Sequence, residues 1–220
     1  LDLAKRTIVV VLSDHGEELG SHAGAPYHKF FQRPWYLGHE FSLYNDVLRV
    51  PLIIHHPRRA PQRFSARVRL MDLAPTLLDV LGIEPARPFD GASLIPVIMG
   101  VDRRDRDIVS VMRSEPERGL SAFALMAGRF KYIYNGPPGE AQHQEFLYDL
   151  SRDPHEQTDL AGQARSRAAS MRAELFRRLE ANQRKARALR SRPRPTPAPE
   201  PTDGQLGELQ ETLKGLGYVE

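Results

Sequence analysis

Residues 7–16 read Thr-Ile-Val-Val-Val-Leu-Ser-Asp-His-Gly. The apolar run from Ile8 to Leu12 is rich in β-branched residues, which predicts a strand buried on both faces of a parallel sheet. Asp14 and His15 follow almost at once, and Gly16 permits a sharp turn of the backbone. Chemistry in open α/β sheets lies just beyond the carboxyl ends of the strands. The run therefore predicts a metal site at the end of a rigid strand.

The composition is that of an ordinary globular protein. The 220 residues are 40% hydrophobic and 27% charged, which is enough for one or two domains with a substantial core. No apolar run approaches the roughly 20 residues of a membrane span, and the start of the chain shows no signal peptide. The opening residues 1–6 resemble the last turn of a helix and lack an initiating Met, so we expect a fragment. With no cysteine, disulfides and thiolate metal sites are excluded within these residues.

The positive charge is concentrated near the end of the chain. The formal net charge is +3, but segment 163–194 alone holds eleven Lys or Arg and two acidic residues. Such a segment can be a surface for nucleic acid or another polyanion. A solvated helix face followed by a basic linker is the simpler explanation, and we favour this interpretation. Nucleic acid is therefore not an expected partner.

The first hundred residues alternate short strands, loops and helices. The predicted elements are a loop at 17–34, a helix at 41–48, a buried strand at 50–55, a short strand at 67–70 and helices at 72–81 and 93–99. Asp72 is expected to cap the longer helix and Gly82 to end it. Asp79 is expected at the surface. The buried stripe of this helix is predicted to be Leu73, Leu77, Leu78 and Leu81.

The pattern changes after residue 105. Short alternating runs predict antiparallel strands at 108–112, 123–127, 130–134 and 145–150. An Arg-rich helix begins near Ala161, with apolar residues at helical spacing (Met171, Leu175, Phe176 and Leu179). We therefore divide the chain into part of an α/β domain at 1–105, a small antiparallel sheet at 106–160, a basic helix at 161–190, a Pro-rich linker at 191–203 and an amphipathic helical tail at 204–220.

Several separated blocks of the sequence resemble the sulfatases of the alkaline-phosphatase superfamily. The block from Ser13 to His22 resembles their second metal-ligand motif, and residues 38–54 resemble the stretch that follows it. Further similar blocks lie at 72–82, 90–94, 148–156 and 216–219. The order and spacing of these blocks carry the resemblance, which covers nearly the whole chain. It implies an α/β fold: the C-terminal part of the sulfatase sheet sandwiched by helices, a small antiparallel-sheet subdomain and a helical tail.

The resemblance also implies roles for particular residues. Asp14 and His15 match metal ligands, and the usual ion is Ca²⁺. Many family members have Asn at the position of His15, so Mn²⁺ and Zn²⁺ stay open. His39 matches a catalytic Lys or His that contacts the sulfate and the leaving oxygen, and His22 lies in a matched block as a further candidate for substrate binding. His28 is a weaker candidate in the loop. The implied substrate is a sulfated small molecule or glycan, and the implied compartment is periplasmic or secreted.

The implied nucleophile is a formylglycine, made from Cys or Ser in a Cys/Ser-x-Pro-x-Arg motif. We expect it, with the remaining metal-binding aspartates, upstream of these residues. The chain by itself is then an inactive fragment of a sulfuric ester hydrolase.

Two alternative functions stay open. One is a phosphatase, phosphodiesterase or phosphoethanolamine-type transferase of the same superfamily, which shares Ser-Asp-His-Gly-Glu. The other is a non-catalytic module that binds polyanions through 163–194.

Overall fold

The computed structural model describes residues 3–22, 37–40, 42–115, 120–137, 143–191, 204 and 206–207. The chain divides into two compact units, Leu1–Glu180 and Ala181–Glu220. His28, the predicted linker beyond residue 191 and nearly all of the predicted tail helix lie outside the described residues. The predicted domain boundaries after residues 105 and 160 stay predictions.

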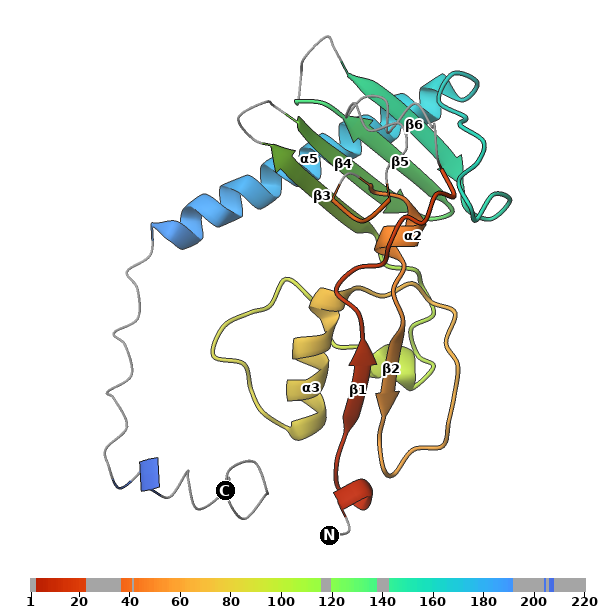
Figure 1. Cartoon of the computed structure of the whole chain (residues 1–220). Coiled ribbons are helices and arrows are strands. Elements are labelled where there is room, and N and C mark those ends of the chain that lie inside the picture. The colour runs from red at the N-terminus through yellow and green to blue at the C-terminus, as the bar shows by residue number, and fades with distance from the viewer. Residues whose placement is uncertain are drawn as a thin grey trace. The chain divides into compact units, whose positions relative to one another are not determined.

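The first strands form a two-stranded sheet. Strand β1 (Val9–Leu12) pairs antiparallel with β2 (Leu52–His55) (Figure 1). In this register Val11 lies opposite Ile53. Both strands were predicted, but the parallel arrangement buried on two faces is wrong for this sheet. Val9, Val11 and Ile53 share one face and are 48%, 53% and 60% exposed. Within the described residues β1 has only this one strand beside it, so its apolar side chains gain little cover.

The helices in this part of the chain are short. They are the 3₁₀ helices η1 (Leu3–Lys5) and η2 (Leu70–Asp72) and the α-helices α2 (Asn45–Leu48), α3 (Leu73–Leu81) and α4 (Ile95–Ile98). Helix α3 ends at Gly82, whose φ of 67° closes the helix as predicted. The strand predicted at 67–70 is wrong, because the described residues there form no strand and lead into η2. The predicted stripe of α3 is wrong at Leu81, which is 61% exposed, whereas Thr76 is buried.

Asp72 is a buried ion-pair residue and does not cap α3 with its side chain. Its carboxylate lies 2.9 Å from the Arg69 guanidinium and 3.0 Å from that of Arg106, and it accepts the Ala92 N–H at 3.0 Å. Burial alone would raise the pKa of Asp72, but the hydrogen bonds from Arg69 and Ala92 outweigh it and hold this pKa below its ordinary value. The ionised Asp72 thus joins η2 to the segments around Ala92 and Arg106.

We expect Asp72→Asn to lower the free energy of unfolding at neutral pH by about 2–3 kcal/mol, because two guanidinium groups lose their buried anion. Because the pKa of Asp72 is lowered in the folded protein, its contribution to the free energy of unfolding is complete above the pKa of a carboxyl in the unfolded chain. That contribution is lost as the pH falls through the pKa of Asp72 in the folded protein. Urea unfolding of the parent and of Asp72→Asn at pH 7 and pH 3 measures this effect. The difference between their free energies of unfolding should be smaller at pH 3. The exposed Asp79→Asn is the matched control, and equal losses in the two variants would contradict the prediction.

The second sheet has four antiparallel strands, as predicted, and their order is β3-β4-β5-β6. They are β3 (Ile108–Glu115), β4 (Leu120–Ala127), β5 (Phe130–Asn135) and β6 (Gln144–Asp149). Gly128 and Arg129 make the turn between β4 and β5, and Gly128 has a φ of 53°. Such a positive φ favours glycine.

Each face of this sheet is covered. Helix α5 (Arg165–Arg190) packs on one face of the sheet (Figure 1). It does so through Met171 and Leu175, as the helical spacing predicted, although it begins at Arg165 and not near Ala161. On the other face, Leu43 and Tyr44 pack against alanine, isoleucine and aromatic side chains of β4, β5 and β6. Since these two residues directly precede α2, the sheet anchors the start of that short helix.

Some of the arginines of α5 form ion pairs with acidic residues of the same chain. Arg172 lies 2.6 Å from Glu145, and Arg178 contacts both Asp107 and Glu174 at 2.6 Å. These pairs agree with a helix face that is partly solvated and partly bound to its own sheet. Within the described part of the chain, no helix has the length and apolar character needed to cross a membrane.

Candidate metal and anion site

The turn after β1 is packed directly against α2. Gly16 N–H donates to the Val47 carbonyl at 2.8 Å, and Ser13 Oγ donates to the His15 carbonyl at 2.6 Å. A Cβ atom at Gly16 would lie 2.0 Å from the Asp46 carbonyl oxygen, so no other residue fits this contact without movement. The glycine therefore lets α2 hold the two predicted metal ligands beside it.

Asp14 and His15 present complementary donor atoms. His15 Nδ1 lies 3.0 Å from the Gly16 carbonyl, so Nδ1–H donates to it and Nε2 keeps its lone pair. This Nε2 is 3.8 Å from Asp14 Oδ1. The His15 backbone N–H donates to Asp14 and lowers the pKa of the exposed Asp14 carboxyl. The structure thus places an ionised carboxylate and a free imidazole nitrogen close together.

His39 joins this pair from the neighbouring segment. Its ring stacks on the His15 ring with centroids 3.8 Å apart, and its Nδ1 lies 2.7 Å from Glu17 Oε1. Two backbone hydrogen bonds between Glu18 and Gly38, at 2.8 and 3.0 Å, hold the two segments side by side. All three predicted main site residues, Asp14, His15 and His39, therefore lie in one cluster.

Glu17 is a member of the cluster for which no role was predicted. Its Oε1 contacts His39 and is 3.8 Å from His15 Nδ1. The available signal was its position, two residues after His15 and inside the motif. Its partner His39 lies 22 positions further along the chain, so the contact was not visible in the pattern.

The donor atoms of the cluster suit a divalent cation. One ligand atom each from His15, Glu17 and His39 lies within 4.8 Å of the others, and Asp14 adjoins His15. Carboxylate oxygens with imidazole nitrogens are ligands that divalent metals accept, and the imidazoles favour Mn²⁺ or Zn²⁺ more than Ca²⁺. The residues present therefore fit the kind of ion that the resemblance implies.

His22 belongs to a second, buried group. Its Nδ1 lies 3.0 Å from Glu18 Oε2 and 3.5 Å from Asp46 Oδ2, and its Nε2 donates to the His155 carbonyl at 2.9 Å. Its ring stacks on Tyr44 at 3.7 Å. Both ring nitrogens are thus engaged within the protein. The substrate-binding role of His22 stays a prediction, and the contacts observed are with protein groups.

One run in the chain has the spacing of the formylglycine motif: Ser114-Glu115-Pro116-Glu117-Arg118. The expectation that this motif lies only upstream of these residues is therefore wrong at the level of sequence. Ser114 belongs to β3 of the four-stranded sheet, whereas Asp14 and His15 follow β1 of the other sheet. The spacing alone consequently assigns no nucleophile.

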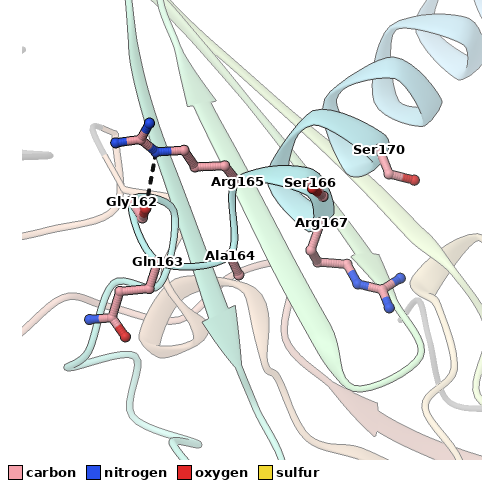
Figure 2. Close-up of a pocket in the computed structure, with 7 residues that line it drawn as sticks. All are labelled: Gly162, Gln163, Ala164, Arg165, Ser166, Arg167 and Ser170. Atoms are coloured by element: carbon pink, nitrogen blue, oxygen red, sulfur yellow. Dashed lines mark hydrogen bonds between the residues drawn. The ribbon is translucent and has the colours of Figure 1, made fainter.

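A separate pocket lies at the start of α5. Figure 2 shows its lining, in which Arg165 Nε donates to the Gly162 carbonyl at 3.3 Å. The lining residues are Gly162, Gln163, Ala164, Arg165, Ser166, Arg167 and Ser170. None of the predicted site residues lines it, and it offers no carboxylate or imidazole ligand for a metal.

Comparisons with known proteins give one consistent result. Residues 33–185 match the family model described as N-sulphoglucosamine sulphohydrolase, C-terminal. The chain is 31% identical over 178 residues to a choline-sulfatase from Rhizobium meliloti and 32% identical over 178 residues to arylsulfatase K from Xenopus laevis. These alignments cover 80% and 77% of this chain, but only 31% and 30% of the relatives, so the chain spans about a third of their length.

Solved structures show the same likeness. The crystal structure of a candidate sulfatase from Bacteroides thetaiotaomicron superposes with a TM-score of 0.66 at 26% identity, over 86% of this chain and 39% of that one. The similarity therefore includes the arrangement of the elements as well as the sequence blocks.

Proposed function

Because the chain belongs to the sulfatase family and has the α/β fold of the C-terminal part of such enzymes, we propose that its site serves the hydrolysis of sulfate monoesters. One observation carries the proposal. Asp14 and His15 come from one segment and His39 from another, yet the three form one cluster with Glu17 beside the end of β1. The activity belongs to the whole protein, of which these residues supply one side of the site.

Asp14 and His15 are proposed to hold the divalent ion. The ion, when bound, stabilises negative charge on the non-bridging sulfate oxygens. Asp14 suits this role because it is ionised, and His15 suits it because the Gly16 carbonyl fixes its tautomer with Nε2 free. Ca²⁺ is the ion that the resemblance implies, with Mn²⁺ and Zn²⁺ as the alternatives, and Mn²⁺ is a suitable first probe because the site combines carboxylate and imidazole donors.

His39 is proposed to contact the substrate. Its Nδ1–H is engaged by Glu17, so Nε2 is the nitrogen that can hydrogen-bond the sulfate or donate a proton to the departing alcohol oxygen. Glu17 holds the imidazole plane in place, as does the stacked His15 ring. The proposed substrate is a sulfated small molecule or glycan, and the proposed compartment is periplasmic or secreted.

The chain itself allows a first test. We expect Mn²⁺ at a hundred times its Kd to raise the free energy of unfolding by about 2.7 kcal/mol. Asp14→Ala should abolish this gain because it removes a charged ligand, whereas Glu84→Gln, at an exposed position on another segment, should keep it. Thermal unfolding with and without Mn²⁺, Ca²⁺ or Zn²⁺ provides the measurement. Equal stabilisation of the Asp14→Ala variant and the parent would remove Asp14 from the metal site.

The second test uses the whole protein with an aryl sulfate and the matching aryl phosphate. A higher kcat/KM for the sulfate ester is expected, and His39→Ala should reduce it. A preference for the phosphate ester would overturn the proposal in favour of phosphoryl transfer, since both reactions can use the same metal ligands.

A further inference from the structure

Lys131, the second residue of strand β5, is a fully buried lysine. Its Nζ lies 2.5 Å from Glu156 Oε1 and donates to Asn45 Oδ1 at 3.1 Å. Burial lowers the pKa of Lys131, and the Glu156 carboxylate opposes this change. A buried ion pair is weak evidence for stability, because hydrophobic residues can often replace it without loss. A role in fixing geometry accounts for its presence better than a role in stability.

Glu156 connects this pair to α2. Its second carboxylate oxygen, Oε2, accepts the backbone N–H of Asn45 at 2.6 Å. Asn45 is the first residue of α2, and the carbonyl of Val47 in the same helix accepts the Gly16 N–H. The contacts thus run from β5 through Glu156 and α2 to the turn that carries Asp14 and His15.

The residue before Glu156 connects to the other segment of the site. The His155 carbonyl accepts His22 Nε2, and His22 Nδ1 faces Glu18. Glu18 forms the paired backbone hydrogen bonds with Gly38, the neighbour of His39. Two adjacent residues after β6 therefore reach both the His15 turn and the His39 segment.

The backbone at this point is itself unusual. Glu156 has a φ of 56°, and it is the single non-glycine residue with positive φ among the residues that the structure describes. A non-glycine residue in this region costs on the order of 1 kcal/mol, and such residues persist where surrounding contacts over-determine them. Here those contacts come from Lys131 and Asn45.

We propose that Glu156, held by Lys131, is a positioning residue: its carboxylate fixes α2 through the Asn45 N–H and so sets the His15 ring against the His39 ring. The small antiparallel sheet then has a direct part in shaping the site, in addition to covering α2. The proposal rests on the proposed function only for what His15 and His39 do. The positioning itself concerns the geometry of this chain.

Two double variants distinguish a Glu156 that positions α2 from a Glu156 that only pairs with the buried charge of Lys131. Lys131→Met/Glu156→Gln and Lys131→Met/Glu156→Met both remove the buried charges, but only the Glu156→Gln change keeps an acceptor for the Asn45 N–H. The readout is the ring-current shift that His15 imposes on the His39 ring protons, measured by NMR on the 220-residue chain. His15→Ala gives the reference for an unstacked His39. The double variant with Glu156→Gln should keep most of the shift, and the one with Glu156→Met should lose most of it.

Equal ring-current shifts in the two double variants would overturn the proposal. If the variant with Glu156→Met does not fold, Glu156→Asp is the variant to measure, because it keeps a charge for Lys131 but draws the carboxylate back from Asn45. An unchanged ring-current shift in Glu156→Asp would equally overturn the proposal. Mn²⁺ titration is the second readout, with an affinity about 10-fold weaker in the variant with Glu156→Met. Failure of the whole protein to bind Mn²⁺ would count against the proposed function, while the NMR result on the 220-residue chain would still decide the positioning role.

Discussion

Gly16→Ala is expected to lower the free energy of unfolding by about 3 kcal/mol, and to abolish stabilisation by Mn²⁺. The new Cβ would lie 2.0 Å from the Asp46 carbonyl oxygen and 3.4 Å from the Val47 Cα, both of which are backbone atoms that cannot rotate away. The turn must therefore separate from α2, and the hydrogen bond from Gly16 N–H to the Val47 carbonyl is lost. Asp14 and His15 would then no longer be held at the end of β1.

Urea unfolding and Mn²⁺ titration of the same samples measure the two effects. Gly162→Ala is the matched control, because no atom lies within 4 Å of a Cβ at that position. We expect the control to change the free energy of unfolding by less than about 0.5 kcal/mol and to keep the Mn²⁺ effect. A Gly16→Ala protein as stable as this control, with its metal affinity intact, would show that the turn is not packed as described.

The elements that were predicted correctly are those set by local pattern. The strands of the second sheet followed from alternating residues and from the turn at Gly128 and Arg129, and the helix ending at Gly82 followed from its stop signal. The apolar run from Ile8 to Leu12 predicted a strand but not its partner, because the same residues suit parallel and antiparallel pairing. The burial of Asp72 was equally hidden, since Arg106 is 34 positions away.

In the candidate site, too, local patterns pointed to some residues, whereas contacts between distant positions could not be read from the sequence. Asp14 and His15 were chosen because they follow a strand directly, and His39 because its block resembles a known family; the structure brings the three together, and their roles stay predictions. Glu17 was not assigned a role, and the contacts of Glu156 join segments that the sequence keeps far apart: Asn45 is 111 positions away. Only a folded chain shows that Glu156, an acid after the last strand, reaches the helix beside the proposed metal ligands.

Lys131→Met is the second variant with a large expected effect. We expect it to lower the free energy of unfolding by about 3–5 kcal/mol, because it leaves the Glu156 carboxylate buried without its cation. Lys131→Met/Glu156→Gln should recover most of this loss, since both charges are then absent and Gln still accepts the Asn45 N–H. The recovery is the evidence that distinguishes an orphaned charge from a loss of packing.

The measurement is urea unfolding of the parent, both single variants and the double variant, which together form a double-mutant cycle. Lys5→Met, at an exposed position, controls for the chemistry of the substitution and should fall within about 0.5 kcal/mol of the parent. If the double variant is as unstable as the sum of the two single variants, the pair is not coupled. In that case Lys131 stabilises the sheet through its aliphatic stem, and Glu156 must hold α2 without help from it.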